Sequence, residues 1–151
     1  MLKDYDILVF RDDKMAGLDF SMLNEIVEAM RRLDRYAAFP VHPRNVIGEL
    51  MESMQQPRYR MLRHRMAKYV AEELEHAKAE VQVHFGCNVS VRDIHHPDTR
   101  PAGDLWMKHI ARCGIQDQIS FHFVAQHYPK ILPIPQEFGF RRSLAPVPQW
   151  V

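Results

Sequence analysis

The stretch PRYRMLRHRMAKYVAEELEHAKAEVQVHFG, residues 57–86, sets the first expectation for the fold. Its apolar residues recur every three or four positions, which is the spacing of one face of an α-helix. They are Tyr59, Leu62, Met66, Tyr69, Val70, Leu74, Ala77 and Val81. Pro57 suits the first turn of a helix, where its missing N–H costs nothing, and Gly86 suits the position after the last turn. The pattern predicts one long helix that forms the spine of the domain.

Shorter helices are expected on both sides of this stretch. The apolar spacing predicts one helix that begins at Ser21 and a second over residues 43–55. Pro40 and Pro43 bracket a loop between them, because each disfavours helix in the residue before it. A further helix is predicted over residues 101–113.

Three segments have the composition of strands. Residues 5–10 contain four consecutive apolar residues, and residues 89–93 and 119–125 alternate apolar with polar residues. With the helix that lies between the last two, residues 87–126 form either a βαβ unit or a hairpin interrupted by a helix. The expected fold class is α+β, with a mainly helical core and a small mixed sheet.

Composition and charge restrict the class of protein. The chain has 151 residues, of which 46% are apolar and 26% charged, as is typical of one globular domain. A formal net charge of +1 provides no overall field that attracts nucleic acid or a membrane surface. The two cysteines do not make a disulfide framework, which favours a reducing compartment. No apolar run suits a signal peptide or a membrane span, so we expect a protein that is not secreted and lies in the cytoplasm or in a particle assembled there.

The two ends of the chain differ in composition from the part between them. We divide the chain into an N-terminal strand or arm (1–14), one globular domain (15–128) and a C-terminal tail (129–151). The tail holds five of the ten prolines. Its aromatic residues include Phe138, Phe140 and Trp150. A disordered tail is usually polar and poor in aromatic residues, so this one is expected to dock on its own domain or on a neighbouring subunit.

Six of the nine histidines and both cysteines fall within residues 84–127. His84 and Cys87 are close in sequence, and His109 and Cys113 are one helical turn apart on one face of a predicted helix. Together the four could bind one zinc ion and fasten the long helix to the helix that follows. The alternative is that His109 and Cys113 are ordinary core residues, since buried free cysteines are common and the spacing is not that of an established zinc motif.

A polar loop after the second predicted strand is the candidate catalytic site. His95 or His96 could act as a general base, with Asp98 to orient the ring. Arg100 could hold a phosphate or a carboxylate. His122, predicted on the polar face of the next strand, could join them. The alternative is a solvated turn, because no established catalytic motif is present.

Five basic residues lie close together at the start of the stretch 57–86. They are Arg58, Arg60, Arg63, Arg65 and Lys68. The N-terminal end of a helix disfavours cations, so these side chains need acidic partners, phosphates or Glu side chains from elsewhere. Nucleic-acid binding is one interpretation. A charged surface that faces solvent or a subunit is the other, and the near-zero net charge favours it.

The function expected first is that of a structural or interaction subunit of a larger assembly. Docking arms at both ends favour contacts with other protein subunits, in a homo-oligomer or a larger assembly. The size and the arms suit a viral or phage particle component, such as a connector, completion or stabilising protein, on architecture alone. A small enzyme or a zinc-binding protein based on residues 84–127, and a nucleic-acid-binding protein based on residues 58–68, are the alternatives. An enzyme is the less favoured class. No cofactor is expected, and zinc is the one alternative to that expectation.

Overall fold

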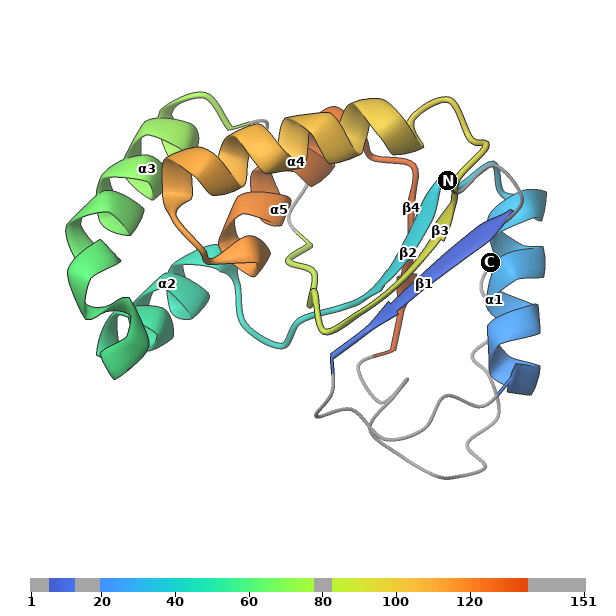
Figure 1. The fold of residues 1–151 in the computed structure, drawn as a ribbon, viewed down its shortest axis with the longest axis horizontal. Helices are drawn as coiled ribbons and strands as arrows, with labels where there is room; N and C mark the ends of the chain where they lie inside the picture. The colour runs from blue at the N-terminus through green and yellow to red at the C-terminus, as the bar shows by residue number, and fades with distance from the viewer. Residues whose placement is uncertain (1–5, 13–19, 78–82, 136–151) are drawn as a thin grey trace.

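The computed structural model describes residues 6–12, 20–77 and 83–135, which form helices and a small sheet (Figure 1). Along the chain the elements are β1 (Ile7–Arg11), α1 (Phe20–Arg32), β2 (Ala37–Pro40), α2 (Val46–Gln55), the 3-10 helix η1 (Pro57–Leu62), α3 (Arg63–Glu75), β3 (Val89–Asp93), α4 (Thr99–Cys113), α5 (Asp117–His127) and β4 (Ile131–Ile134). Helices combined with a four-stranded mixed sheet confirm the α+β class.

The sheet has the strand order β1-β3-β2-β4. Both β1 and β2 run antiparallel to β3, whereas β4 runs parallel to β2 on its other side. In the register, Val9 of β1 and Ala38 of β2 pair with Val91 of β3. β3 and β2 are therefore the central strands of the sheet.

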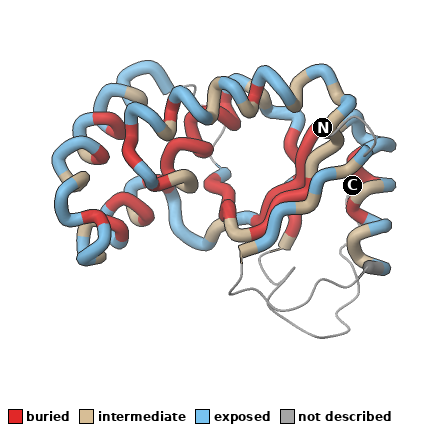
Figure 2. Tube along the Cα trace, in the orientation of Figure 1, coloured by how far each residue is buried: buried red, intermediate tan, exposed pale blue. Residues whose placement is uncertain are grey.

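Helices cover each face of the sheet. Successive side chains of a strand point to opposite faces, so Ala38 and Val91 meet α1. Phe39, on the opposite face, packs with Ala102 of α4 and Phe121 of α5. Figure 1 shows α1 on one side of the sheet and α4 and α5 on the other. Figure 2 shows that buried residues are concentrated along the strands between these layers.

Beside the sheet, α2, η1 and α3 pack with parts of α4 and α5 into a further apolar cluster. Its buried members are Val46, Leu50, Tyr59, Met66, Tyr69, Val70, Cys113, Ile119 and Phe123. Arg65 of α3 donates hydrogen bonds to the carbonyls of Ala111 and Arg112, which lie in the last turn of α4, where carbonyl groups otherwise lack partners. The Arg112 side chain forms ion pairs with Glu72 and Glu73. Charged as well as apolar contacts therefore hold α3 and α4 together.

The expected helices α1, α2 and α4 and strands β1 and β3 are present, with ends within a few residues of those predicted. At α2 the structure shows why the helix begins where it does, because Asn45 directly precedes it and caps its first turn. The Asn45 side chain accepts a hydrogen bond of 2.8 Å from the Gly48 N–H, one of the groups that a helix start leaves without an intrahelical partner.

No helix among the described residues is long and apolar enough to cross a membrane.

The expected spine helix is wrong. The stretch contains η1 and then α3, which ends at Glu75. Near that end Leu74 is 43% exposed, so the apolar stripe is no longer covered, and Val81 lies outside the described residues. Further along, Phe85 forms an antiparallel β-bridge with Val41, which requires extended backbone. Helical spacing indicated the apolar face correctly, but not how far neighbouring elements cover it.

The strand predicted over residues 119–125 is also wrong, because this segment lies in α5. Every residue from Ile119 to Gln126 is buried. A helix that is buried on all sides has no polar face, so its sequence carries no helical period. Gln116 caps the helix by accepting a hydrogen bond from the Gln118 N–H. Local alternation of apolar and polar residues therefore misled the prediction.

The sequence pattern did not predict β2 (Ala37–Pro40), which directly precedes the loop expected between Pro40 and Pro43, and all four of its residues are buried. Proline cannot donate to a sheet, but Pro40 ends the strand, and its carbonyl accepts a hydrogen bond of 2.8 Å from the Gly86 N–H. The parallel pair of the sheet is β2 with β4. Both the βαβ unit and the interrupted hairpin expected over residues 87–126 are therefore wrong.

The segments expected as arms contribute strands to the same sheet. β1, from segment 1–14, pairs with β3, and β4, from segment 129–151, pairs with β2. The aromatic residues expected to bind a partner, Phe138, Phe140 and Trp150, lie outside the described residues. Their docking on a neighbouring subunit stays a prediction.

Replacing Gly114 with alanine is expected to destabilise the protein. Gly114 follows α4 with φ of 103°, and a Cβ there would lie 3.2 Å from Leu62 Cδ1. We expect a loss of roughly 1–3 kcal/mol in the free energy of unfolding, measured by urea denaturation. The control is Gly103→Ala inside α4, where a Cβ would meet no atom within 4 Å and stability should rise by roughly 0.5–1 kcal/mol. Equal stability of the two variants would contradict the strain assigned to Gly114.

Candidate metal centre

Two histidines are brought together where the pairing of β2 and β3 continues beyond the strands. Val41 and Phe85 form an antiparallel bridge, and the His42 N–H donates a hydrogen bond of 2.7 Å to the His84 carbonyl. The centroids of the two imidazole rings are 5.1 Å apart. Backbone pairing therefore sets the separation of the two side chains.

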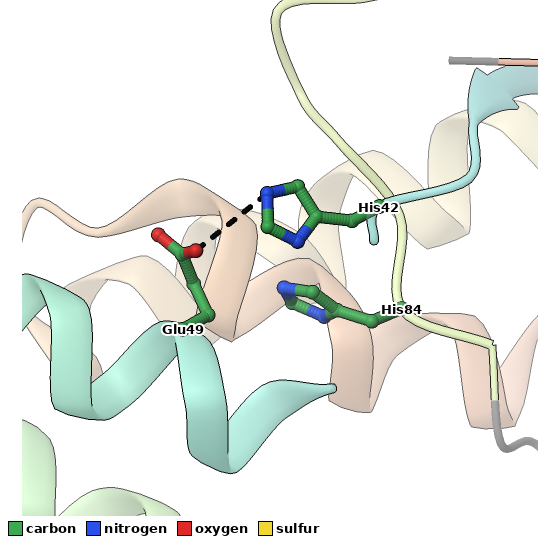
Figure 3. Close-up of side chains that lie close together, drawn as sticks. All are labelled: His42, Glu49 and His84. Carbon is green, nitrogen blue, oxygen red and sulfur yellow. Dashed lines mark ion pairs between the residues drawn. The ribbon is translucent and has the colours of Figure 1, made fainter. Parts of the chain in front are cut away.

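Glu49, from the first turn of α2, is the third member of the site and is only 6% exposed. Its Oε1 accepts hydrogen bonds from Gln116 Nε2 at 3.2 Å and from the Ser53 hydroxyl at 3.4 Å. Its Oε2 lies 3.6 Å from His42 Nε2 and 3.8 Å from Arg44 Nη1. Neutral donors thus anchor one carboxylate oxygen, while the other lies toward His42 (Figure 3).

His84 is buried with no hydrogen-bond partner for its imidazole. It is 2% exposed, and neither ring nitrogen bonds to another described residue. An unpaired polar group in the interior costs about 1–3 kcal/mol. Burial lowers the pKa of His84 to about 3, and the neighbouring His122 and His42 add to the shift. At neutral pH the ring is therefore uncharged and has a free lone pair, which is the form that binds metal ions.

A further imidazole, that of His122 in α5, lies next to His84. The two ring centroids are 5.4 Å apart, and His122 is 6% exposed. Its Nδ1 has no hydrogen-bond partner among the described residues. Burial lowers the pKa of His122, and a hydrogen bond with the backbone of Val83 opposes that shift. His122 thus adds a second uncharged ring beside His84.

His42, Glu49 and His84 together have the chemistry of a metal site. One donor atom from each lies within 4.8 Å of those of the other two, and Figure 3 shows both rings directed toward the carboxylate. Around a tetrahedral zinc ion with bonds of about 2.0 Å, neighbouring donors are about 3.3 Å apart. Small movements of the side chains would therefore bring the three donors onto one ion. Two histidines and one glutamate, with a fourth position open, are an established zinc ligand set.

Among the described residues, the cluster of possible metal ligands that contains His84 does not include the other three residues of the zinc set expected from the sequence, Cys87, His109 and Cys113. His84 lies beside His42, whereas Cys87 is buried in the cluster between the sheet and α4. His109 forms a hydrogen bond of 2.7 Å with the Tyr69 hydroxyl. Cys113 is packed in the cluster of α2 and α3, and burial raises the pKa of its thiol to about 12. That shift disfavours the thiolate that a zinc ion needs.

The two histidines of the expected catalytic loop have carboxylate neighbours on other segments. His95 Nε2 lies 3.2 Å from a carboxylate oxygen of Asp6. His96 Nε2 lies 3.2 Å from Asp34, and its Nδ1 is 3.9 Å from Asp98. Asp98 is thus near His96, as expected, but the two histidines face different carboxylates.

Arg100 and His122, the other two candidates, do not join this loop. The side chain of Arg100 is 92% exposed and pairs with Asp104 one turn further along α4. The ring contacts of His122 are with His84 and Phe123. Of the expected acid–base set, Asp98 therefore lies near His96, whereas the Arg100 side chain pairs within α4 and His122 contacts His84.

The five basic residues at the start of the stretch 57–86 have different surroundings. Arg65 is bonded to the end of α4, and Lys68 forms an ion pair of 3.8 Å within α3. Arg58 lies over an aromatic ring of η1, with 4.6 Å to the ring centre. Arg60 is exposed, and the Nε of Arg63 is buried without a hydrogen-bond partner among the described residues. Nucleic-acid binding by this segment stays a prediction.

Sequence reasoning missed His42 and Glu49. A signal was present for Glu49, which lies on the same face of α2 as the buried Val46 and Leu50. A charged residue at a buried position of a helix needs partners and so marks a site. For His42 there was no comparable signal, because its neighbour His84 is far away along the chain.

Comparisons of the chain with known protein families, with curated proteins and with solved structures find no match. The assignment of the site therefore rests on its own residues, distances and burial. The main features are two paired histidines and a buried carboxylate with one anchored oxygen.

Replacing His109 with asparagine is expected to weaken the pH dependence of stability. Burial lowers the pKa of His109, and the Glu73 carboxylate opposes that shift. The folded-state pKa of His109 therefore lies below the ordinary histidine value of about 6.5. Near and below this pH the unfolded chain binds more protons than the folded one, so stability is lost as the pH falls. Between about pH 7.5 and about pH 5.5, the wild type should lose more free energy of unfolding than the variant, measured with EDTA present. If the His109→Asn variant lost more free energy of unfolding than the wild type over this pH range, the burial of an uncharged imidazole at His109 would be contradicted.

Proposed function

We propose that the protein binds one divalent transition-metal ion, zinc in the first place, through His42, Glu49 and His84. The observation that carries the proposal is the buried His84, which lies beside a second imidazole and a buried carboxylate. Its ring nitrogens have no hydrogen-bond partner among the residues that the structure describes. A metal ion takes the lone pair of an uncharged imidazole and so supplies the missing partner. Nitrogen and carboxylate donors without a thiol suit zinc, and also iron.

The proposed ion would join three segments of the chain. His42 follows β2, Glu49 belongs to α2, and His84 precedes β3. An ion that binds only the folded protein stabilises it, by about 4 kcal/mol at a concentration one thousand times Kd. The function supported by these observations is metal binding that fastens α2 to the sheet, with a fourth position open to water or a small ligand.

Zinc is expected to bind the full-length protein at one site and to raise its Tm, as measured by calorimetric titration and thermal denaturation after EDTA treatment. His84→Leu removes a ligand together with two unpaired nitrogens. Zinc binding should therefore be lost, while the metal-free variant is at least as stable as the wild type, because an apolar side chain replaces an unsatisfied one. Gln116→Leu removes a donor to Glu49 and should weaken zinc binding about 10–100-fold.

The matched control is His109→Asn, because His109 belongs to the zinc set expected from the sequence. This variant should bind zinc as the wild type does. Loss of binding in both His109→Asn and His84→Leu would assign the ion to that other set, because His84 belongs to both sets. A wild type that binds neither zinc nor Fe(II) would refute the proposal.

An interaction role in a larger assembly is a second proposal, with copies of this chain as the partners. It is supported by the apolar and aromatic composition of residues 129–151. It is also supported by Leu8 and Phe10 on the outer strand β1, which are 37% and 50% exposed, since exposed apolar side chains at a sheet edge favour association. The narrower role in a viral or phage particle is part of this proposal and rests on architecture alone.

A deletion that tests this second proposal has to begin after Pro135, because a deletion from residue 129 would also remove β4 and uncover one side of β2. Removing residues 136–151 is expected to convert an oligomer into a monomer, as measured by size-exclusion chromatography with light scattering. The far-UV circular dichroism should stay that of the full-length protein. A full-length protein that is monomeric at every concentration tested would contradict the proposal.

A further inference from the structure

We propose that His122 positions His84 for metal binding, by accepting a hydrogen bond from the His84 ring nitrogen that does not bind the ion. This inference rests on the proposed metal site and extends it to α5, the helix that carries His122. His122 would act on the ion only through His84. It is therefore a positioning residue and not a fourth ligand.

A histidine that binds a metal ion through one ring nitrogen carries a proton on the other, and this N–H needs an acceptor. The other two proposed ligands already have outer partners. His42 Nδ1 lies 3.4 Å from the Arg44 carbonyl oxygen, which accepts its proton once Nε2 binds the ion. The Oε1 of Glu49 accepts a hydrogen bond of 3.2 Å from Gln116. His84 is the ligand whose ring has no such partner among the described residues.

His122 offers an acceptor, because its own hydrogen bond decides which of its nitrogens carries the proton. Burial lowers the pKa of His122, and a hydrogen bond between its ring and the backbone of Val83 opposes that shift. A backbone contact that favours the protonated imidazole is one in which a ring N–H donates to a carbonyl oxygen. Since Nδ1 has no partner among the described residues, the donor to Val83 is Nε2. In the uncharged ring Nδ1 therefore has a free lone pair.

The two imidazoles are close enough for the proposed hydrogen bond. Their centroids are 5.4 Å apart, and their planes are inclined by 59°. Small rotations of the two side chains would bring one nitrogen of His84 to within about 3 Å of His122 Nδ1. His84 is 2% and His122 6% exposed, so water has little access as a competing acceptor. The bonds would then run from the ion through both rings to the Val83 carbonyl.

Such a hydrogen bond fixes the tautomer and the orientation of the ligand ring and makes its metal-binding nitrogen more basic. Loss of the acceptor should therefore weaken metal binding although all three ligands are kept. It should leave the number of bound ions unchanged.

The first test compares the zinc affinity of the full-length wild type with that of two variants, by calorimetric titration after EDTA treatment. His122→Phe keeps a ring of similar size without an acceptor and should weaken zinc binding about 10–100-fold. His122→Asn places an amide oxygen near the position of Nδ1, and it should bind zinc about two- to tenfold more tightly than His122→Phe. The matched control is Val124→Ala, which removes buried side-chain volume from α5. It should lower Tm and bind zinc as the wild type does.

The second test uses the zinc-loaded wild type, labelled with ¹⁵N-histidine, in long-range ¹H–¹⁵N NMR spectra. We expect one ring nitrogen of His84 to be bound to zinc and the other to carry a proton. The protonated nitrogen should show a scalar coupling to His122 Nδ1 across the hydrogen bond. A residue that only fills space in α5 would not produce this coupling. The signals are assigned by comparison with His84→Leu and His122→Phe.

The outcomes separate this inference from the proposed function. A wild type that binds neither zinc nor Fe(II) would refute the metal site itself. Wild-type zinc affinity in a folded His122→Phe would leave the metal site standing and overturn the role of His122. Zinc bound directly to His122 Nδ1 would make this residue a ligand, which also overturns it. If His122→Phe does not fold, as judged by far-UV circular dichroism, the absence of the coupling in the zinc-loaded wild type would exclude the hydrogen bond.

Discussion

The antiparallel pairing of residues 37–42 with residues 84–92 is the constraint on which the rest of the structure depends. It begins with Ala37 opposite Arg92 and continues through the hydrogen bond from the His42 N–H to the His84 carbonyl. Buried backbone groups have to be paired, and this pairing makes β2 and β3 the central strands with a helical layer on each face. It also keeps the chain extended at Phe85, where helical spacing predicted the end of a spine helix.

The same pairing places the proposed metal site on the side of the sheet that α5 covers. His84, beside His122 of α5, belongs to the paired segment. Its buried imidazole lacks a hydrogen-bond partner among the described residues. Folded proteins rarely leave such groups unpaired, because their desolvation is not compensated. A metal ion bound between the sheet and its helices would supply that partner.

The fold could be predicted where one face of an element is buried and the other is solvated. The helices α1, α2 and α4 meet this condition, and Asn45 marks the start of α2 by its side-chain hydrogen bond. Prediction failed for α5, whose residues are buried on every side, and for β2, which is buried although it ends in Pro40. In both segments tertiary burial outweighed the local pattern, because periodicity reports only a contrast between two faces.

By itself, the sequence determined the α+β class, the helices with one apolar face and the presence of His84 among the possible metal ligands. Glu49 could also have been predicted as a site residue, because it is a charged residue on the buried face of a helix. Only the tertiary structure decided that His84 meets His42 and Glu49, that Cys87 and Cys113 lie in separate clusters, and that His122 lies beside His84. The physical reason is that donors far apart in sequence converge only after hydrogen bonds between strands have set the register and the helices have packed on the sheet.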